Sequence, residues 1–457
     1  MYTVRRLAEY VHSLTPDGLS GAARDAALRC LLDLMTAALA GYETPGARAA
    51  RQAAFGLYAR GESTVWFAGR RLKGPGAAFA NSAAASMLDL DDGHRAACGH
   101  PGAAVIPAAL AVAEETCAGA DDLLTAIAVG YEVGVRVAAA RDVSALGAYS
   151  SGTWCGYGAV AAAGRLRRLR PDQLAHALAI AGVSAPNQAA AGTSGYSRLT
   201  GNSVKEGIPW ATATALMALS LAEGDFTGPE DILDHAPHYD SARIVEGLGR
   251  GFLIERTYFK PYSACRWAHA AIDGLGLLME EHGLTPAQLG AIEIHTFSRA
   301  LRLGNQRNPA TLVDAQYSVP YCVALRAVVG ADALLPLTED ALGRSDVVAL
   351  AEKVTLYLDP ELERRFPAHT PARVVLRTAK GTLERLVETP LGDPGNPLSW
   401  DALRAKFRAV TRTLMSEDDR RRLLSAVDSL AAGDLSPLRE ALHRPLASTQ
   451  RSGSFLG

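Results

Sequence analysis

The sequence predicts a mainly α-helical protein with an α+β insert, and three observations lead to this fold class. Alanine and glycine are abundant and aromatic residues make up only 6% of the 457-residue chain, which suits closely packed helices better than aromatic-rich strands. Apolar residues recur at helical spacing from residue 1 to about residue 254. After about Trp267, several segments alternate apolar and polar residues, as half-buried strands do.

The chain is too long for one compact core, so we expect at least two domains. We predict a large helical domain made of residues 1–267 and 398–457, and a smaller α+β domain made of residues 268–397. A cleft between two such bodies is where a small-molecule site most often lies.

The helical part begins with an amphipathic segment and continues in long apolar stretches with few β-branched runs. Short polar residues or proline mark helix starts at residues 15–16, 121–122 and 171–172. Helices are predicted at residues 22–40, 103–118, 123–140 and 159–169. Two glycine-rich stretches are poor helix formers and are predicted to be loops, at residues 147–158 and 191–201.

The insert opens with a predicted helix at residues 268–281 and then changes to strand patterns. Strands are predicted at residues 291–297, 353–358, 373–378 and 382–388. Gly381 forms the turn that joins the last two strands as a hairpin. Helices are predicted inside the insert at residues 318–329 and 338–351, and after its Pro/Gly-rich end (393–397) at residues 400–413 and 417–431.

Charge, hydropathy and cysteine spacing exclude several classes of protein. The net charge of −2 provides no basic field for a nucleic-acid backbone, so we expect no nucleic-acid partner. No run of about 18 uncharged apolar residues occurs, so we expect no membrane-spanning helix. The six cysteines form no CxxC pair, which argues against a disulfide framework or structural zinc and favours the cytoplasm. Dinucleotide-binding, GxSxG hydrolase and P-loop motifs are also missing from the sequence.

The densest polar cluster in an apolar neighbourhood comprises Asp89, Asp91, Asp92, His94 and His100. Three carboxylates and two histidines within twelve residues can supply proton-transfer groups or hold a divalent metal. The alternative is structural, with the aspartates ending one helix and His100 starting the next. Both interpretations stay open on the pattern alone.

A second cluster lies at the junction between the two predicted domains and contains Lys260, Cys265, Arg266 and His269. Arg266 can bind a carboxylate through two hydrogen bonds while Cys265 transfers a proton. The structural alternative is a buried cysteine in an interdomain turn, with Arg266 in an ordinary salt bridge.

A third cluster combines glycines with Arg198, Lys205 and Glu206. Such a stretch can shape an anion site at a helix start. A solvated Lys205–Glu206 pair is the simpler interpretation.

Several separated motifs resemble those of one enzyme family, and the resemblance runs through nearly the whole chain. The matching segments are residues 88–92, 99–107, 152–153, 226–229, 260–262, 265–266, 318–321, 392–397 and 406–407. At these residues the chain resembles the MmgE/PrpD family, which includes 2-methylcitrate dehydratase, cis-aconitate decarboxylase and iminodisuccinate epimerase. The resemblance implies a helical domain with an inserted α+β lid, usually as a homodimer, and a metal-free site for small di- or tricarboxylates between domain and lid.

The resemblance also implies roles for single residues. Asp89 and His100 match acid/base positions of the family, Tyr321 matches a tyrosine of the lid, and Lys260 matches a basic position at the start of the lid.

Four positions depart from the family's dehydratases and decarboxylases. Tyr149 stands in place of a histidine, Ser197 in place of a lysine, Gly93 in place of a threonine, and Cys265 in place of the lid histidine. Lys205 is a candidate to replace the lysine missing at Ser197. These changes argue against assigning the activity of 2-methylcitrate dehydratase or of cis-aconitate decarboxylase.

The resemblance implies carbanion chemistry at the carbon next to a carboxylate, which needs a base within reach and cations that stabilise the developing charge. We expect a cofactor-free lyase of the dehydratase or decarboxylase type. His100 is the predicted general acid or base, oriented by Asp89. Lys260 and Arg266 are expected to hold a substrate carboxylate. The return proton is expected from Cys265, Tyr149 or Tyr321.

Further predicted substrate-binding residues are Arg198, Lys205, Asp92, His94 and His269. Three alternatives remain open: an epimerase with Cys265 as the second proton-transfer group, a binding protein on an inherited fold, and a metal-dependent hydrolase that uses Asp91, Asp92 and His94.

Overall fold

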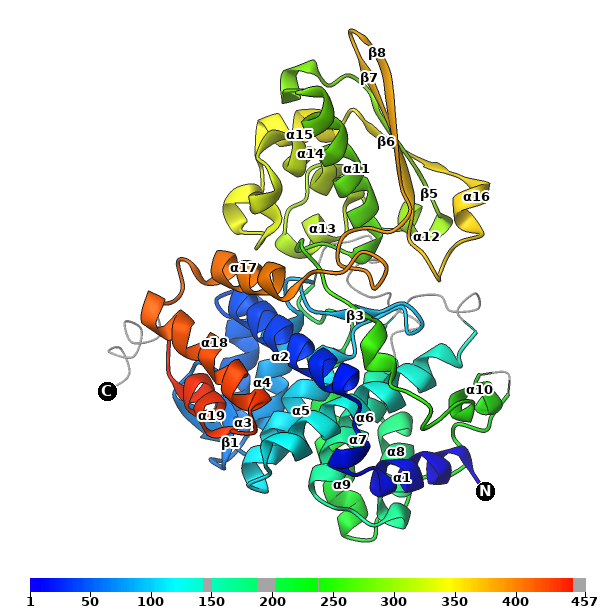
Figure 1. The fold of residues 1–457 in the computed structure, drawn as a ribbon, viewed down its shortest axis with the longest axis vertical. Helices are drawn as coiled ribbons and strands as arrows, with labels where there is room; N and C mark the ends of the chain where they lie inside the picture. The colour runs from blue at the N-terminus through cyan, green and yellow to red at the C-terminus, as the bar shows by residue number, and fades with distance from the viewer. Residues whose placement is uncertain (143–149, 187–201, 237, 447–457) are drawn as a thin grey trace.

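The computed structural model describes residues 1–142, 150–186, 202–236 and 238–446, which form a large helical body and a smaller α+β body. Figure 1 shows the smaller body above the larger one, with the segment around β3 (Gly93–His94) between them. The predicted fold class, mainly α-helical with an α+β insert, is confirmed.

The helical body is assembled from both ends of the chain, because the last three helices return to it after the insert (Figure 1). Its helices are α1 (Thr3–Ser13), α2 (Gly21–Gly41), α3 (Pro45–Leu57), α4 (Gly74–Ser86), α5 (Gly102–Glu115), α6 (Ala120–Ala139), α7 (Cys155–Leu166), α8 (Pro171–Val183), α9 (Ile208–Glu223), α10 (Ser241–Val245), α17 (Trp400–Thr411), α18 (Glu417–Ala431) and α19 (Ser436–His443). Two small antiparallel ladders join β1 (Ser63–Val65) to β2 (Arg70–Leu72) and β3 to β4 (Thr257–Tyr258).

The smaller body packs helices against one four-stranded sheet in the order β6-β5-β7-β8. β5 and β6 are parallel, whereas β7 is antiparallel to both β5 and β8. α11 covers β7 and β8, and α14 packs on α11 (Figure 1). The bounds are β5 (Ile292–Thr296), β6 (Val354–Leu358), β7 (Ala372–Thr378), β8 (Gly381–Val387), α11 (Arg266–His282), α12 (Ser298–Leu301), α13 (Leu312–Gln316), α14 (Val319–Val328), α15 (Ser345–Ala351) and α16 (Pro360–Glu363).

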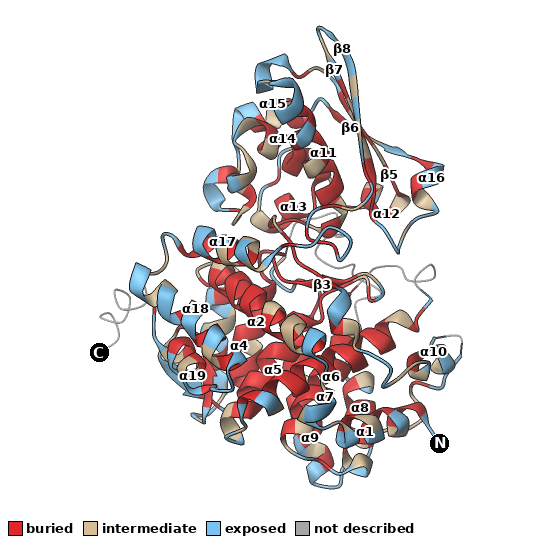
Figure 2. Cartoon of the chain, viewed as in Figure 1, coloured by how far each residue is buried: buried red, intermediate tan, exposed pale blue. Residues whose placement is uncertain are grey.

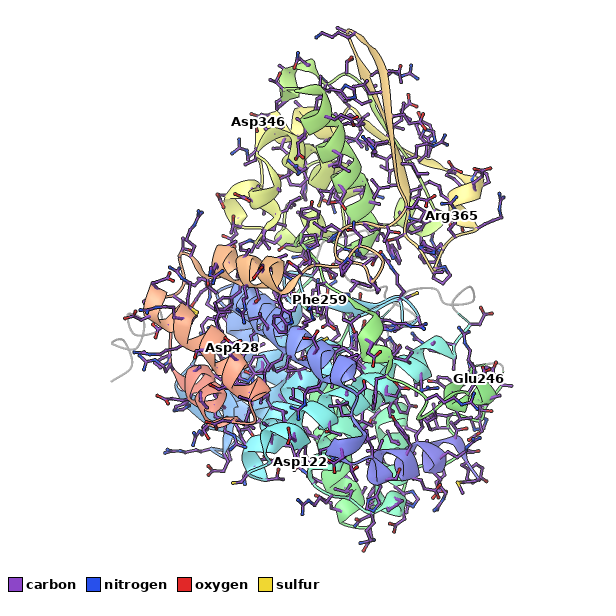
Figure 3. All side chains as sticks on the ribbon, in the orientation of Figure 1. Asp122, Glu246, Phe259, Asp346, Arg365 and Asp428 are labelled. Atoms are coloured by element: carbon purple, nitrogen blue, oxygen red, sulfur yellow. The ribbon has the colours of Figure 1, made fainter. Side chains whose placement is uncertain are left out.

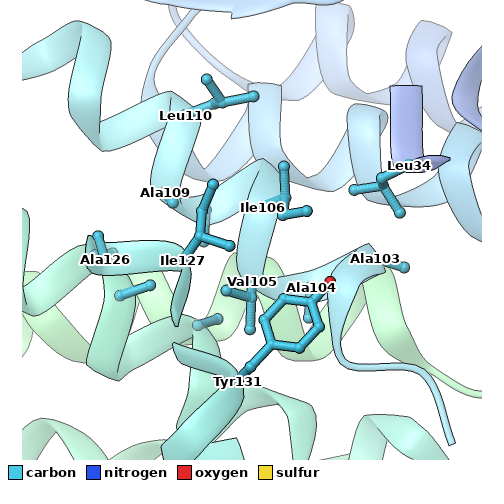
Figure 4. Packing of buried hydrophobic residues seen from close by; sticks show 14 of the residues in the cluster. Leu34, Ala103, Ala104, Val105, Ile106, Ala109, Leu110, Ala126, Ile127 and Tyr131 are labelled. Carbon is cyan, nitrogen blue, oxygen red and sulfur yellow. The ribbon is translucent and has the colours of Figure 1, made fainter. Parts of the chain in front are cut away.

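Each body has its own hydrophobic core. The larger core takes residues between Val4 and Phe259 and again from Leu398 onward, whereas the smaller core takes residues between Tyr262 and Val387. α5 is apolar on every side and lies at the centre of the larger core, as a helix surrounded by other helices must. Figure 4 shows the Tyr131 ring against Val105 and Ala104 of this helix. Figure 2 shows that burial continues from this core into the segment around β3.

Two predicted helix boundaries differ from the structure, and in each case a glycine is the reason. Residues 155–158, expected in a loop, form the first turn of α7, where a Cβ on Gly158 would lie 2.6 Å from the carbonyl oxygen of Gly130. Glycine is therefore used there for close helix packing. The helix expected at residues 338–351 is interrupted at Gly343, which has φ +68°, so that only α15 is α-helical. The other predicted loop, residues 191–201, lies outside the described residues.

The chain crosses between the two bodies twice, and the two crossings are held side by side. The backbone N–H of Phe259 donates to the carbonyl oxygen of Gly392 over 3.0 Å, and Figure 3 marks Phe259 at this junction. Gly392 has φ +94°, and a Cβ at this position would overlap the carbonyl oxygen of Phe259. The domain boundary placed at residue 267 falls just inside α11.

Among the described residues, no helix combines the length and the hydropathy that crossing a bilayer requires.

A candidate active site between the two bodies

A small cavity of about 40 Å³ lies at the junction of the two bodies. The helical body contributes His100 and Glu206 to its wall. The segment in which the chain first crosses to the smaller body contributes Lys260 and Cys265, and the smaller body contributes Tyr317. A single water needs about 10–15 Å³ of such volume, so the cavity has room for a few waters or one end of a small polar molecule.

Asp89 forms the charged centre of this site. It follows the end of α4 in a left-handed turn (φ +53°) that directs its side chain away from the helix. Its carboxylate lies 3.2 Å from Lys260 Nζ and 3.4 Å from Lys205 Nζ, and Lys260 Nζ also donates to the Asp89 carbonyl oxygen over 2.9 Å. Burial alone would raise the pKa of Asp89, but the two ammonium groups hold it well below its usual value.

A third buried lysine holds the other side of this segment. Lys406 of α17 donates to the Asp33 carboxylate over 2.6 Å and to the carbonyl oxygen of Leu90 over 3.0 Å. The C-terminal helices therefore fix the backbone beside Asp89.

His100 is held from one side and open on the other. Its Nδ1 lies 3.0 Å from Asp91 Oδ2, a hydrogen bond that fixes the plane of the ring. Its Nε2 lies 3.7 Å from Asp89 Oδ1 and 3.8 Å from Glu206 Oε1, both beyond hydrogen-bond length. The expectation that Asp89 orients His100 is therefore wrong in detail: Asp91 orients it.

The pKa of His100 is raised above its ordinary value of 6.5. Burial and Lys260 act to lower this pKa, but the carboxylates of Asp91 and Glu206 outweigh them. At any given pH, the protonated fraction of His100 is therefore larger than that of a histidine with the ordinary pKa.

Glu206 is a site residue that the sequence interpretation missed. Its Oε2 accepts hydrogen bonds from Ser151 N (2.7 Å) and Ser151 Oγ (2.6 Å), and its other oxygen faces His100. The expected solvated Lys205–Glu206 pair is wrong, since the two residues are only 2% and 8% exposed. Their place directly before the apolar start of α9 was the available signal.

The smaller body contributes Gln316 and Tyr317 instead of the predicted Tyr321. Gln316 Oε1 accepts a hydrogen bond from Lys205 Nζ (2.9 Å), and the Tyr317 ring lies 5.0 Å from the same ammonium group. Tyr321 is fully buried in the smaller core, where its hydroxyl donates to the carbonyl oxygen of Ala341. The structure therefore brings together Lys205 and Tyr317, but it does not bring Tyr321 to the cavity.

Cys265 borders the cavity at the N-terminal end of α11. Burial and the nearby Asp89 carboxylate raise the pKa of its thiol to about 12. Cys265 is therefore a neutral thiol, which can donate a proton but is a poor base at neutral pH.

Arg266 and His269 mainly stabilise the place where the chain returns from the smaller body to the helical body, near residues 390–393. Arg266 lies 3.0 Å from Asp393 and donates to the carbonyl oxygens of Leu391 (2.8 Å) and Pro390 (3.0 Å). His269 lies between Arg266 (3.1 Å) and the carbonyl oxygen of Ala264 (3.0 Å). Arg266 still borders the cavity, so its predicted contact with a carboxylate stays a prediction.

Asp92 and His94 have different hydrogen-bond partners. Asp92 accepts a hydrogen bond from Tyr131 (2.8 Å), and burial together with Asp33 and Asp91 raises its pKa. His94 Nε2 lies 3.1 Å from the carbonyl oxygen of Leu253, and burial lowers its pKa to about 4. The alternative metal set of Asp91, Asp92 and His94 is therefore not assembled.

A different trio, Asp89, Asp91 and His100, does bring its ligand atoms within 4.8 Å of one another. The two ammonium groups already beside Asp89 would repel a divalent cation there. These residues fit poorly as a metal site. Three further predicted residues, Tyr149, Ser197 and Arg198, lie outside the described residues.

Replacing Asp91 with Asn is expected to lower the pKa of His100, because it removes the carboxylate that favours the imidazolium. Glu206→Gln is expected to shift the pKa in the same direction by less, since Glu206 lies farther from the ring. NMR titration of the histidine Cε1 signals measures both shifts. Asp122→Asn, at a partly exposed residue of α6, serves as the control. An unchanged His100 pKa in Asp91→Asn would contradict the assignment.

Comparison with known proteins adds to this geometry. The MmgE/PrpD N-terminal domain matches residues 5–239, and the MmgE/PrpD C-terminal domain matches residues 262–432. A cis-aconitate decarboxylase of Aspergillus terreus is 27% identical over 97% of this chain and 96% of its own. A cis-aconitate decarboxylase-like protein of Aspergillus oryzae, oryM, is 25% identical over 94% of this chain and 95% of its own.

Proposed function

The chain belongs to the MmgE/PrpD family, and on that premise we propose that it is a cofactor-free lyase of the decarboxylase type, acting on a small polycarboxylic acid. The observation that carries the proposal is His100, whose Nδ1 is held by Asp91 while Nε2 is open toward the cavity. A proton can pass between that nitrogen and a bound substrate.

The raised pKa of His100 favours an acid role. In a decarboxylation, the bond between the carboxyl carbon and its neighbour breaks, carbon dioxide leaves, and the electron pair stays on the carbon skeleton. The His100 imidazolium then protonates the resulting carbanion and becomes a neutral imidazole. The cycle closes when His100 takes a proton from water.

The lysines supply positive charge where the substrate needs it. Lys260 borders the cavity and Lys205 stands behind it against Tyr317, so both can stabilise the negative charge that develops during the reaction. Arg266 borders the same cavity and is the candidate to hold a second carboxylate.

Two alternatives remain. An epimerase would use His100 and the neutral Cys265 thiol on opposite faces of one carbon. A binding protein on the family fold would hold a carboxylate without reacting with it. Because the similar proteins include a cis-aconitate decarboxylase, cis-aconitate is the first substrate to test. Four positions differ from the family pattern (Gly93, Tyr149, Ser197 and Cys265), so we propose a class of substrate and not one compound.

The test is incubation of the protein with small di- and tricarboxylates in deuterium oxide, cis-aconitate among them, followed by NMR and carbon dioxide detection. Carbon dioxide release with deuterium in the product supports the decarboxylase. Exchange without carbon dioxide, lost in Cys265→Ser, would instead identify an epimerase. Binding without either change would identify a binding protein.

The proposal includes a homodimer in the cytoplasm. All six cysteines are free thiols, as in a reducing compartment. Trp210 and Met217 are about half exposed on one face of α9, where a second subunit would bury them. Light scattering on the purified protein measures the subunit number.

A further inference from the structure

A second, larger cavity of about 810 Å³ adjoins the reaction cavity. The two cavities share His94, Arg95 and Pro367 in their walls, so they meet at these residues. The outer walls come from the end of α6, from α10 and from the turn at residues 253–256 on one body, and from the loops near residues 367–369 and 393–395 on the other. In Figure 1, α10 and α16 lie on this same side of the molecule.

This second cavity is rich in positive charge. Four arginines line it against two aspartates, whereas the whole chain carries a net charge of −2. An anionic molecule that approaches this chain therefore gains nothing from the overall charge and is attracted only locally.

Two of the four arginines have structural hydrogen-bond partners, and the other two have none among the described residues. Arg95 is held by both oxygens of Asp393 (2.6 and 2.8 Å), and Arg141 donates to Thr153 (2.9 Å). Arg243 and Arg256 are solvent-exposed, and among the described residues neither side chain has a hydrogen-bond or ion-pair partner. The fold does not use these two guanidinium groups, although they flank a cavity of ligand size.

We propose that this second cavity is an anion-capture vestibule, in which Arg243 and Arg256 hold a carboxylate of the substrate before it passes Arg95 and Pro367 into the reaction cavity. This inference rests on the proposed function, because it takes the substrate to be a polycarboxylate. The two arginines increase the rate at which the substrate is captured, and they do not change the rate of the chemical step.

The test is the double variant Arg243→Glu/Arg256→Glu, compared with Arg6→Glu/Arg250→Glu. The control makes the same change in net charge at exposed arginines that border neither cavity. At low ionic strength the vestibule variant is expected to lose about tenfold in kcat/KM with kcat unchanged, and the control to lose little. At about 0.5 M salt the two variants should converge, because screening removes the attraction.

A binding measurement keeps the vestibule separate from the reaction. Tricarballylate is a saturated tricarboxylate without a double bond or hydroxyl group, and calorimetry at low salt measures its binding. The vestibule variant is expected to bind it about fivefold or more weakly than the control variant, by the same electrostatic attraction.

The outcomes distinguish the two proposals. Arginine-dependent binding of tricarballylate by a protein that turns over no carboxylate would overturn the proposed function and keep the vestibule. Turnover with kcat/KM equal in the vestibule and control variants would overturn the vestibule and keep the function. A wild-type protein that does not bind tricarballylate would also overturn the vestibule.

Discussion

Replacing His100 with Ala is expected to lower kcat by about 100-fold or more while the protein stays folded, since a positioned acid or base contributes about that much. The reason is geometric: Nε2 of His100 faces the cavity and has no hydrogen-bond partner at normal length among the residues that the structure describes. Steady-state kinetics measure the loss, and circular dichroism checks the fold.

The control for this variant is His282→Gln, which removes an exposed histidine at the end of α11. Exogenous imidazole provides a second check, because it can occupy the space left in His100→Ala and restore part of the rate. Retention of more than about a tenth of kcat would rule out His100 as the main proton-transfer group.

The pH profile tells the two possible roles of His100 apart. As an acid, His100 must be protonated, so kcat/KM should fall as pH rises through its raised pKa, above 6.5. As a base, it must be neutral, and kcat/KM would rise over the same pH range. The first result supports decarboxylation and the second supports proton abstraction.

Replacing Lys260 with Met is expected to lower the free energy of unfolding by about 3 kcal/mol, because it leaves the buried Asp89 carboxylate with one ammonium partner instead of two. Lys205 remains 3.4 Å away, which keeps the loss at the lower end for a broken buried pair. Urea denaturation followed by tryptophan fluorescence measures the change.

A double-mutant cycle isolates the contact. Lys260→Met/Asp89→Asn is expected to lose at least about 1 kcal/mol less than the sum of the two single variants, since it removes both charges together. Arg421→Met, in an exposed pair with Asp418, is the control and should leave the urea midpoint unchanged. Additive losses in the cycle would mean that Lys260 does not interact with Asp89.

The fold follows closely from local sequence patterns. The helix predicted at residues 417–431 coincides with α18, and the four predicted strands of the insert each end within one residue of β5 to β8. These elements depend on periodicity along the chain, which a single sequence contains. The predictions failed at two glycines. Gly158 is set by a neighbouring helix and Gly343 by its backbone angle, and the periodicity of a sequence contains neither.

The site follows from the sequence only in part. Asp89, His100, Lys260 and Cys265 were found through motifs and do line one cavity. The partner of His100 is Asp91, two residues from the expected Asp89, because the left-handed turn at Asp89 decides which carboxylate faces the ring. Glu206 and Tyr317 were not selected, because Glu206 was interpreted as half of a solvated pair and no motif included Tyr317.

Lys406 has a consequence for how the protein is made. The ammonium group that fixes the backbone at Leu90 lies in α17, which is synthesised after the whole α+β body. A nascent chain that stops before α17 has every predicted catalytic side chain but lacks this support beneath them, and the larger core is also open at its C-terminal helices. Incomplete chains are therefore expected to be inactive and to be removed by proteolysis, so that translation itself acts as a check on the finished enzyme.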